Sequence, residues 1–214
     1  MNEVAIRKFK KEDRQALRDI AWDTAFMGEP ADAFFDSRQL LQDFLTAYFT
    51  DYEPQSCFVA EAGREVIGYL IGAKDIAALG KIFRDKILPK LFINLFFSGA
   101  VFKKKNFTYI LGCLGGSLSG EFRMPDFSKD YPATLHINLK KDWRSQHIGA
   151  RLMAVYLDYL RIEKVRGVCL ATASSKAAEF FSQQGFILLH RGKRSYFRSI
   201  LNSDIPIFIY GKKI

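Results

Sequence analysis

The pattern of apolar and polar positions in the first 75 residues predicts short strands and helices in turn. The predicted elements are, in chain order, a strand at residues 3–7, helices at 10–26 and 37–49, and strands at 56–62 and 65–75. Ser37 precedes the second helix and is a predicted N-cap. Gly63 and Arg64 separate the two later strands, a spacing typical of an antiparallel hairpin.

In the last 80 residues, strands alternate with helices. The predicted elements are a strand at 133–139, a helix at 147–163, a strand at 167–172, a helix at 175–184 and strands at 186–190 and 205–213. This alternation is typical of parallel strands joined by crossover helices. The sequence therefore predicts a mixed α/β fold (α/β, or α+β mixed) in a single domain over residues 1–214.

A helical insertion is predicted at residues 76–130, between the third and fourth strands. Its first part is rich in apolar and basic residues at helical spacing. The glycine-rich stretch GCLGGSLSG at 112–120 is expected to end regular structure there. As a functional element the insertion can be a lid over the substrate site, a membrane-surface helix or a docking surface. The favoured interpretation is a helical flap that packs its Phe and Leu residues on the core, leaves its lysines in solvent and helps to shape the substrate pocket.

Composition and charge narrow the class of protein. The chain has 214 residues, of which 49% are hydrophobic and 26% charged, which excludes disordered and collagen-like chains. Lysine and arginine total 32 against 23 acidic residues, for a net charge of +9 that predicts an anionic partner. Residues 81–105 alone carry seven basic residues and one acid, and residues 176–214 are also basic. The excess positive charge is therefore concentrated in these two segments.

Cysteines, termini and hydropathy exclude several further classes. Cys57, Cys113 and Cys169 are odd in number and far apart, which disfavours a zinc site or a disulfide framework, and buried thiols are expected. No metal is predicted. The apolar run at 91–102 has only twelve residues, too few to span a bilayer. The first fifteen residues lack the apolar core of a signal peptide, so the expected location is cytoplasmic.

The junction between the strand at 133–139 and the following helix predicts an anion site. Unpaired backbone N–H groups and the positive end of the helix dipole meet there. Arg144 can add a full positive charge, and Gly149 keeps side-chain bulk away. The predicted anion-binding loop comprises Arg144, Ser145, Gln146, His147, Ile148, Gly149 and Ala150.

Two motifs give a resemblance to a known family. RSQHIG at 144–149 matches the cofactor motif Q/R-x-x-G-x-G/A of the GNAT acetyltransferase superfamily, and SSKAAEFFSQQGF at 174–186 matches its motif N-x-x-A-x-x-F/L-Y-x-x-x-G-F. The chain resembles this superfamily from its first strand to residue 190, outside the insertion. Within it, residues 130–153 resemble bacterial members similar to the acetyltransferase-like domain joined to O-GlcNAc hydrolase.

The resemblance implies a GNAT fold, with a splayed mixed sheet of six to seven strands flanked by helices. It implies an acetyl-CoA-dependent N-acetyltransferase of class EC 2.3.1.-, in which an acceptor amine attacks directly in a ternary complex. Pantetheine would pair with the strand edge at Ile137 and Leu139, and pyrophosphate would bind the amides of 144–149. The amine acceptor, a small molecule or a peptide, stays unidentified. The resemblance also places the basic segments 81–105 and 176–214 around the substrate cleft, where an acidic acceptor would fit.

Three positions depart from the family motifs. His147 stands at the first motif glycine, where a Cβ is unusual. Ser174 replaces asparagine, and a serine N-cap can fill its structural role. Phe181 replaces the tyrosine thought to protonate the leaving thiolate. Ser174 and Phe181 are nonetheless expected beside the cofactor.

The candidates for catalysis lie on the strand at 133–139 and near the C-terminus. His136 and Asn138 share one strand face, where His136 is either a general base or a structural histidine and Asn138 can orient substrate or water. The N–H near Leu139 is a candidate oxyanion donor. Tyr196 and Ser182 are the hydroxyls that can replace the missing tyrosine, unless solvent supplies that proton.

Two alternative functions remain open at this point. Because of Phe181, the protein can instead be a catalytically weak CoA-binding pseudo-enzyme or regulator. The basic, aromatic stretch RGKRSYFR at 191–198 suggests a nucleic-acid module, but no nucleic-acid-binding motif accompanies it. The oligomeric state, a homodimer included, also stays open.

Overall fold

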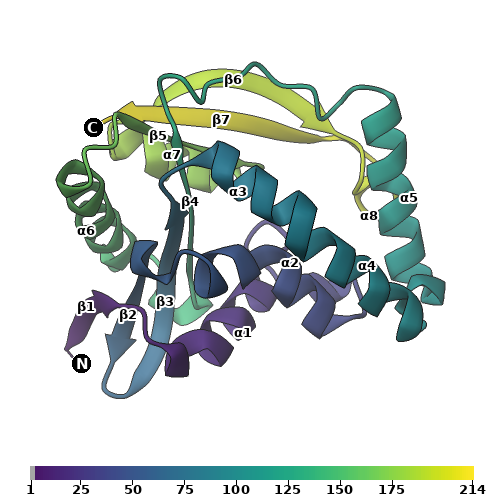
Figure 1. Cartoon of the computed structure of the whole chain (residues 1–214), viewed down its shortest axis with the longest axis horizontal. Helices are drawn as coiled ribbons and strands as arrows, with labels where there is room; N and C mark the ends of the chain where they lie inside the picture. Colours follow the sequence, from purple (N-terminus) through teal and green to yellow (C-terminus); the bar gives the residue numbers. More distant parts are fainter. Residues whose placement is uncertain (1–2) are drawn as a thin grey trace.

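A computed structural model describes residues 3–214, and a seven-stranded sheet runs through them (Figure 1). The strands are β1 (Val4–Lys8), β2 (Cys57–Ala62), β3 (Glu65–Ala73), β4 (Ala133–Leu139), β5 (Gly167–Thr172), β6 (Ile187–Arg194) and β7 (Ile205–Lys213). Their order in the sheet is β1-β2-β3-β4-β5-β7-β6, and β4 and β5 form the parallel pair. The predicted mixed sheet flanked by helices is confirmed.

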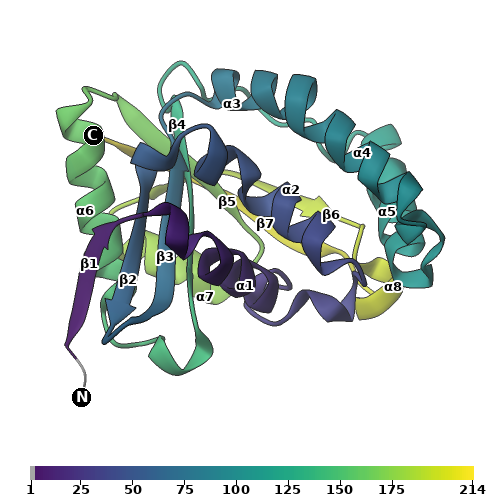
Figure 2. The same cartoon turned by 60° about the horizontal axis from the view of Figure 1, so that its bottom comes forward.

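Helices cover both faces of the sheet (Figure 2). The flanking helices are α1 (Arg14–Thr24) and α2 (Arg38–Asp51) on one face, and α6 (Ile148–Ile162) and α7 (Ser175–Gln183) on the other. Leu17 and Ile20 of α1 pack with Tyr69 of β3 in the first core. Leu152 and Tyr156 of α6 pack in the second. Because β2 and β3 are buried on both faces, their sequences read as nearly continuous apolar runs.

The sheet opens between β4 and β5. These strands pair only where Ala133 and Thr134 lie beside Val168 and Cys169. Beyond that point β5 pairs with β7, while β4 pairs with β3 through Leu139. Residues 135–139 of β4 therefore present a backbone edge without a strand partner in the described sheet, as the resemblance implied.

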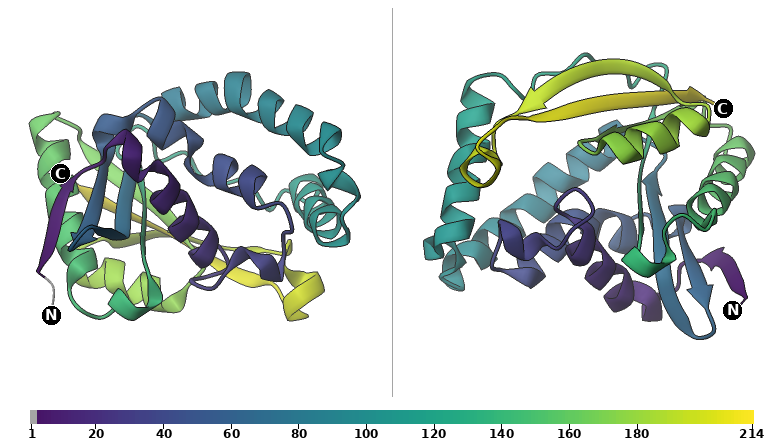
Figure 3. Two further views of the ribbon diagram at one scale, coloured as in Figure 1. Left: turned by 90° about the horizontal axis from the view of Figure 1, so that it is seen from below. Right: turned by 180° about the vertical axis from the view of Figure 1, so that it is seen from behind.

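The insertion between β3 and β4 is helical and crosses from the α2 side to the far edge of β6 (Figures 1 and 3). Its elements are α3 (Ile76–Ile82), a π-helical segment η4 (Phe83–Ile87), α4 (Leu88–Phe97), a 3-10 turn η5 (Ala100–Phe102) and α5 (Lys104–Leu118). Buried Asn106 anchors α5, because its amide nitrogen donates to Ala100 O and Ser37 Oγ, both at 2.8 Å. Ser37 stands at the N-cap position of α2, but its side chain accepts this bond instead of capping the helix.

The glycine-rich end of the insertion is a correction to the sequence prediction. Gly112, Gly115 and Gly116 lie inside α5, which continues to Leu118. At Gly112 the helix approaches the backbone so closely that a Cβ would stand 3.1 Å from both Cα and O of Tyr196. Tertiary packing of α5 on this segment therefore overrides the poor helix propensity of glycine.

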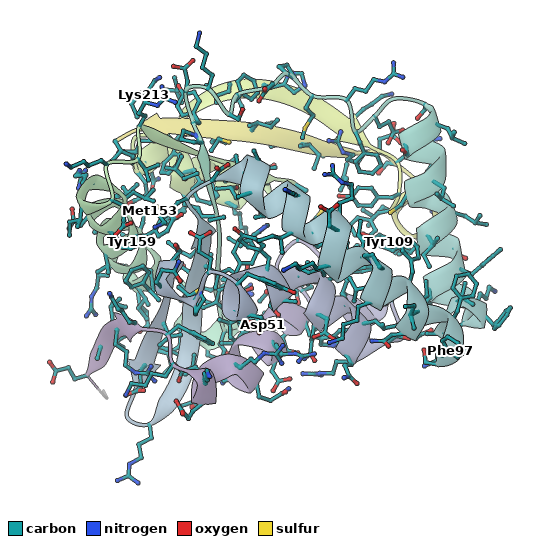
Figure 4. The ribbon with its side chains drawn as sticks, in the orientation of Figure 1. Asp51, Phe97, Tyr109, Met153, Tyr159 and Lys213 are labelled. Carbon is teal, nitrogen blue, oxygen red and sulfur yellow. The ribbon has the colours of Figure 1, made fainter. Side chains whose placement is uncertain are left out.

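A third core joins α5 to the segment before α8 (Arg198–Leu201). It is largely aromatic, and Tyr109, which Figure 4 labels, packs against it through ring contacts with Phe34, Phe35 and Phe197. The ring centroids of Tyr109 and Phe34 are 4.8 Å apart, and those of Tyr196 and Phe197 are 4.7 Å apart. This aromatic cluster fixes the insertion against the C-terminal part of the chain.

Smaller differences concern boundaries and cysteines. The strand predicted at 186–190 extends to Arg194, because β6 pairs with β7 as far as Arg194 and Ile205. Cys57 and Cys169 are buried as predicted, whereas Cys113 is only half-buried. The N-terminal segment in which no signal peptide was predicted includes residues 1 and 2, which lie outside the described residues. No helix within residues 3–214 is long and apolar enough to cross a membrane.

Candidate active site

The open edge of β4 supplies backbone donors to the gap between β4 and β5. Lys140 N donates to Ile67 O at 2.9 Å, so this amide points toward β3. Amide directions alternate along an antiparallel strand, and the N–H groups of Leu139 and Ile137 therefore point away from β3, into the gap. Both groups were predicted to meet the cofactor, and the topology leaves both free to donate.

The loop after β4 has the geometry of an anion site. Ser145 and His147 adopt left-handed backbone conformations, with φ of 62° and 58°. His147 is the N-cap of α6, and its side chain makes no capping bond, so the first amides of α6 have no acceptor from the cap. Amides that converge in such a turn, together with the helix dipole, attract phosphate. The left-handed φ of His147 also explains why a glycine is usual at this motif position.

Arg144 is engaged with backbone carbonyls. Its Nη2 donates to Gly28 O at 2.8 Å, and its Nε donates to Leu139 O at 3.2 Å. Gly28 belongs to the turn that follows α1 and has a φ of 101°, a conformation that favours glycine. Arg144 therefore ties the turn between α1 and α2 to the end of β4. Its predicted contact with phosphate stays a prediction.

The two candidate catalytic side chains of β4, those of His136 and Asn138, lie on one face of the strand. Asn138 Nδ2 donates to Tyr69 OH at 2.7 Å, which fixes the amide, and burial raises the pKa of Tyr69. The ring of His136 meets Phe49 edge-on, with centroids 5.6 Å apart. The imidazole reaches solvent, yet the protein packed around it desolvates the charged form and lowers the pKa of His136. Neutral His136 is thus the dominant form at pH 7.

The sequence model of the Acetyltransferase (GNAT) family matches residues 14–186 of this chain. This match agrees with the two sequence motifs, with the split between β4 and β5 and with the loop before α6. The chain belongs to this family. It is therefore an acyltransferase that uses acetyl-CoA as its co-substrate. A search of curated proteins finds no match.

Solved structures support the GNAT fold. SsHAT is 22% identical with a TM-score of 0.71, covering 99% of this chain and 98% of that one. A polyamine N-acetyltransferase of Drosophila melanogaster that forms N-acetylagmatine is 13% identical with a TM-score of 0.64, covering 99% and 100%. A putative acetyltransferase of Salmonella typhimurium, solved with acetyl-CoA, is 11% identical with a TM-score of 0.56, covering 99% and 94%.

The residues of this GNAT protein fit acetyl-CoA. The amides of Ile137 and Leu139 lie along the gap, and the turn at Ser145 and His147 lies at its end. A Cβ at Gly149 would stand 3.4 Å from the ring of Phe180, so the start of α6 also packs closely on α7. Phe180 was not predicted as a site residue, and its apolar character gave no signal to separate it from core residues. Gln146 lies within the same turn, where its Nε2 donates to Asp142 O at 3.0 Å, and Ala150 lies in the first turn of α6.

The later GNAT motif builds α7. Ser174 Oγ accepts from Ala177 N at 3.4 Å, which confirms the predicted serine N-cap. Phe181 is buried in the core on the α6 side, where its ring lies 5.7 Å from that of Phe186. Ser182 Oγ donates to Ala178 O at 3.1 Å and points toward this same core. The structure thus places Phe181 in the core and shows no contact between Ser182 and β4 within residues 3–214.

Tyr196 lies in the aromatic cluster of the insertion. Its ring stacks on Phe122, with centroids 6.2 Å apart, and meets Tyr109 edge-on at 5.7 Å. Burial raises the pKa of Tyr196. Its described contacts come from α5, the loop after it and Phe197, so the structure does not bring Tyr196 onto His136 and Asn138.

A pocket of about 380 Å³ lies beside the C-terminal end of β4. Its lining includes Asp23 and Glu29 from the α1 side, and Lys141 and Arg144 from the loop after β4. Glu29 pairs with Lys141 at 3.4 Å across this pocket. More than a hundred residues separate the two sides in sequence, so no local pattern predicted the acidic groups there.

Proposed function

We propose that this protein transfers an acetyl group to a small primary amine by direct attack in a ternary complex. Acetyl-CoA supplies the acetyl thioester, and the new N–C bond forms as the C–S bond breaks. The observation that carries the proposal is the open edge of β4, where unpaired amides lie beside His136 and Asn138 on one strand. No covalent enzyme intermediate is part of the proposal.

The chain's own residues divide the remaining work. Neutral His136 accepts the proton that the ammonium group of the acceptor must lose before its nitrogen can attack. The N–H of Leu139 donates to the oxygen on which negative charge develops. Asn138, held by Tyr69, orients the acceptor or a water molecule. Because Phe181 has no hydroxyl, solvent returns a proton to the leaving thiolate; a role for Tyr196 in that step stays a prediction.

The pocket beside β4 is lined by charged groups of both signs. Asp23 and Glu29 line it together with Lys140, Lys141 and Arg144. Glu29 pairs with Lys141 at 3.4 Å and Asp23 lies 3.8 Å from Arg38, so the charge of the pocket does not by itself select a cationic acceptor. Two structural neighbours are a polyamine N-acetyltransferase and an agmatine N-acetyltransferase. These neighbours favour a small cationic amine over the acidic acceptor that the net charge suggested.

The test measures release of free CoA thiol over a panel of amines, with product mass confirmed by mass spectrometry. The panel includes agmatine, linear polyamines, aromatic amines and acidic peptides. We expect turnover with cationic small amines, and His136→Ala is expected to lower kcat by about a hundredfold or more. His190→Ala, which changes a histidine of β6, is the matched control and is expected to leave kcat unchanged.

The pH profile gives a second readout of His136. Its pKa is lowered in the folded protein, so the neutral base persists at pH values where an ordinary histidine, with a pKa of about 6.5, is half protonated. The rate is expected to hold down to about pH 6.5 and to fall below it, and His136→Ala is expected to abolish that fall. A profile unchanged in His136→Ala contradicts the assignment of the base.

A CoA-binding protein with little turnover is the second candidate, and Phe181 is the observation that favours it. Thermal stabilisation by acetyl-CoA, together with no thiol release from any amine of the panel, would support this candidate. Turnover with any amine at a saturable rate excludes it.

A further inference from the structure

The turn between α4 and α5 exposes large apolar side chains. Phe97 ends α4 with 90% of its surface exposed, and Phe102 lies just before α5 with 83% exposed. Figure 4 shows Phe97 at an outer corner of the molecule, away from the sheet. We call Phe96, Phe97 and Phe102 the insertion tip. Among the described residues no element covers these rings, although burying each of them would be favourable.

Exposed apolar residues continue from the insertion tip along both helices. The further members, each at least half exposed, are Phe92, Ile93, Phe107, Leu111, Leu114 and Leu118. Those of α5 recur at intervals of four, three and four residues, which places them in one stripe along the helix. The other side of α5 carries Asn106 and Gly112, which contact the body of the protein. The stripe is therefore the unpacked side of a docked helix.

Basic side chains accompany this apolar surface. They are Lys81, Arg84, Lys86, Lys90, Lys103, Lys104 and Lys105. The sole acid among residues 81–105, Asp85, pairs with Arg84 at 3.1 Å. Lys103 donates to Asp36 O, and Lys105 donates to Asp32 O and pairs with the Asp36 carboxylate at 3.3 Å. Lys90 and Lys104 form no ion pair with any residue in 3–214. Free cations thus lie on both sides of the insertion tip.

The charge decides between the occupants of this surface. A second copy of the chain would bring the same excess of lysines against these lysines, and like charges oppose association. A bilayer with anionic headgroups offers both an apolar layer for the phenylalanines and negative charge for the lysines. We propose that the helical insertion docks this protein on an anionic membrane surface, with the insertion tip in the headgroup layer.

The experiment is co-sedimentation of the full chain with vesicles. One set contains phosphatidylcholine with phosphatidylglycerol, and the other contains phosphatidylcholine alone. We expect the protein to sediment with the anionic vesicles, not with the neutral ones, and binding to weaken as salt is added. Failure to bind anionic vesicles at low salt overturns the proposal.

Paired variants separate the apolar and electrostatic contributions. Phe97→Ser with Phe102→Ser is expected to weaken binding by about tenfold or more, and Lys90→Glu with Lys104→Glu is expected to abolish it. The control is Ile162→Ser with Lys164→Glu, which makes one apolar-to-serine change and one charge reversal at an exposed site by the end of α6, across the molecule from the insertion (Figure 3). Acetyl transfer to a soluble amine is expected to be unchanged in all three, which also shows that each is folded.

The remaining outcomes each count against the proposal. Vesicle binding that the tip variants leave unchanged places the contact elsewhere. A dimer in sedimentation analysis that the tip variants dissociate, without vesicle binding, identifies a second copy as the occupant. If an acidic polypeptide displaces the protein from vesicles and binds the Phe97→Ser, Phe102→Ser variant as tightly as the parent protein, the partner of this surface is an acidic protein.

Discussion

Two glycines three positions apart in α5 give a direct test of how the insertion docks. Gly115 is exposed, and a Cβ added there would meet no atom within 4 Å. Gly112 faces the segment before α8, and its Cβ would stand 3.1 Å from Cα and O of Tyr196. The substitutions Gly112→Ala and Gly115→Ala add the same methyl group to the same helix, so they differ only in what that methyl contacts.

The expected free energies have opposite signs. Alanine gains about 1 kcal/mol over glycine inside a helix, so Gly115→Ala is expected to raise the free energy of unfolding by about that amount. At Gly112 the same gain is opposed by overpacking, which typically costs about 1–3 kcal/mol. The backbone at Tyr196 cannot easily yield, because Ser195 N donates to Glu121 Oε2 at 2.8 Å. We expect Gly112→Ala to lower stability by about 1 kcal/mol, a difference of about 2 kcal/mol between the variants.

Urea denaturation followed by circular dichroism measures this difference. Equal m-values in the two variants and the parent protein would show that the comparison is valid. If Gly112→Ala stabilises the protein as much as Gly115→Ala does, α5 does not dock on the Tyr196 backbone as described. The close approach of α5 to the Tyr196 backbone would then not be the reason for a glycine at position 112.

Three further predictions concern the site. Arg144→Ala removes two hydrogen bonds to backbone carbonyls and is expected to raise KM for the amine and Kd for acetyl-CoA by about tenfold. The control Arg151→Ala loses one hydrogen bond, to Val4 O, and is expected to change neither constant. An unchanged KM in Arg144→Ala would contradict the positioning role of Arg144. Phe181→Tyr places a hydroxyl in an apolar core, so Tm is expected to fall while kcat rises at alkaline pH; a kcat unchanged at every pH would show that position 181 has no part in proton return. Tyr69→Phe removes the partner of the Asn138 amide and is expected to lower kcat several-fold without moving the pH profile, so a shifted profile would count against a purely orienting role.

Local patterns in the sequence were sufficient for most elements and for the turn before α6. Helical spacing placed α1, α2, α6 and α7, because the side chains that each helix buries recur with its own period. The serine N-cap at Ser174 was likewise predictable, because a cap involves only neighbouring residues. The motif at 144–149 located the anion turn for the same reason.

The site and the insertion depended on contacts between distant segments. Nothing near Arg144 in sequence indicates that its guanidinium holds Gly28, or that Asp23 and Glu29 share a pocket with Lys141. The position of Tyr196 in the aromatic cluster likewise follows from the path of α5, a helix that local propensity argued against.

The sequence by itself determined where the chain forms most of its strands and helices and that it belongs to the GNAT acetyltransferases. Each of these depends on interactions among neighbouring residues or on a contiguous motif. The tertiary structure alone decided which basic and apolar residues stay uncovered and which carbonyls Arg144 holds. It also decided that glycines at 112–116 continue a helix, because the free energy of docking α5 exceeds the cost of those glycines.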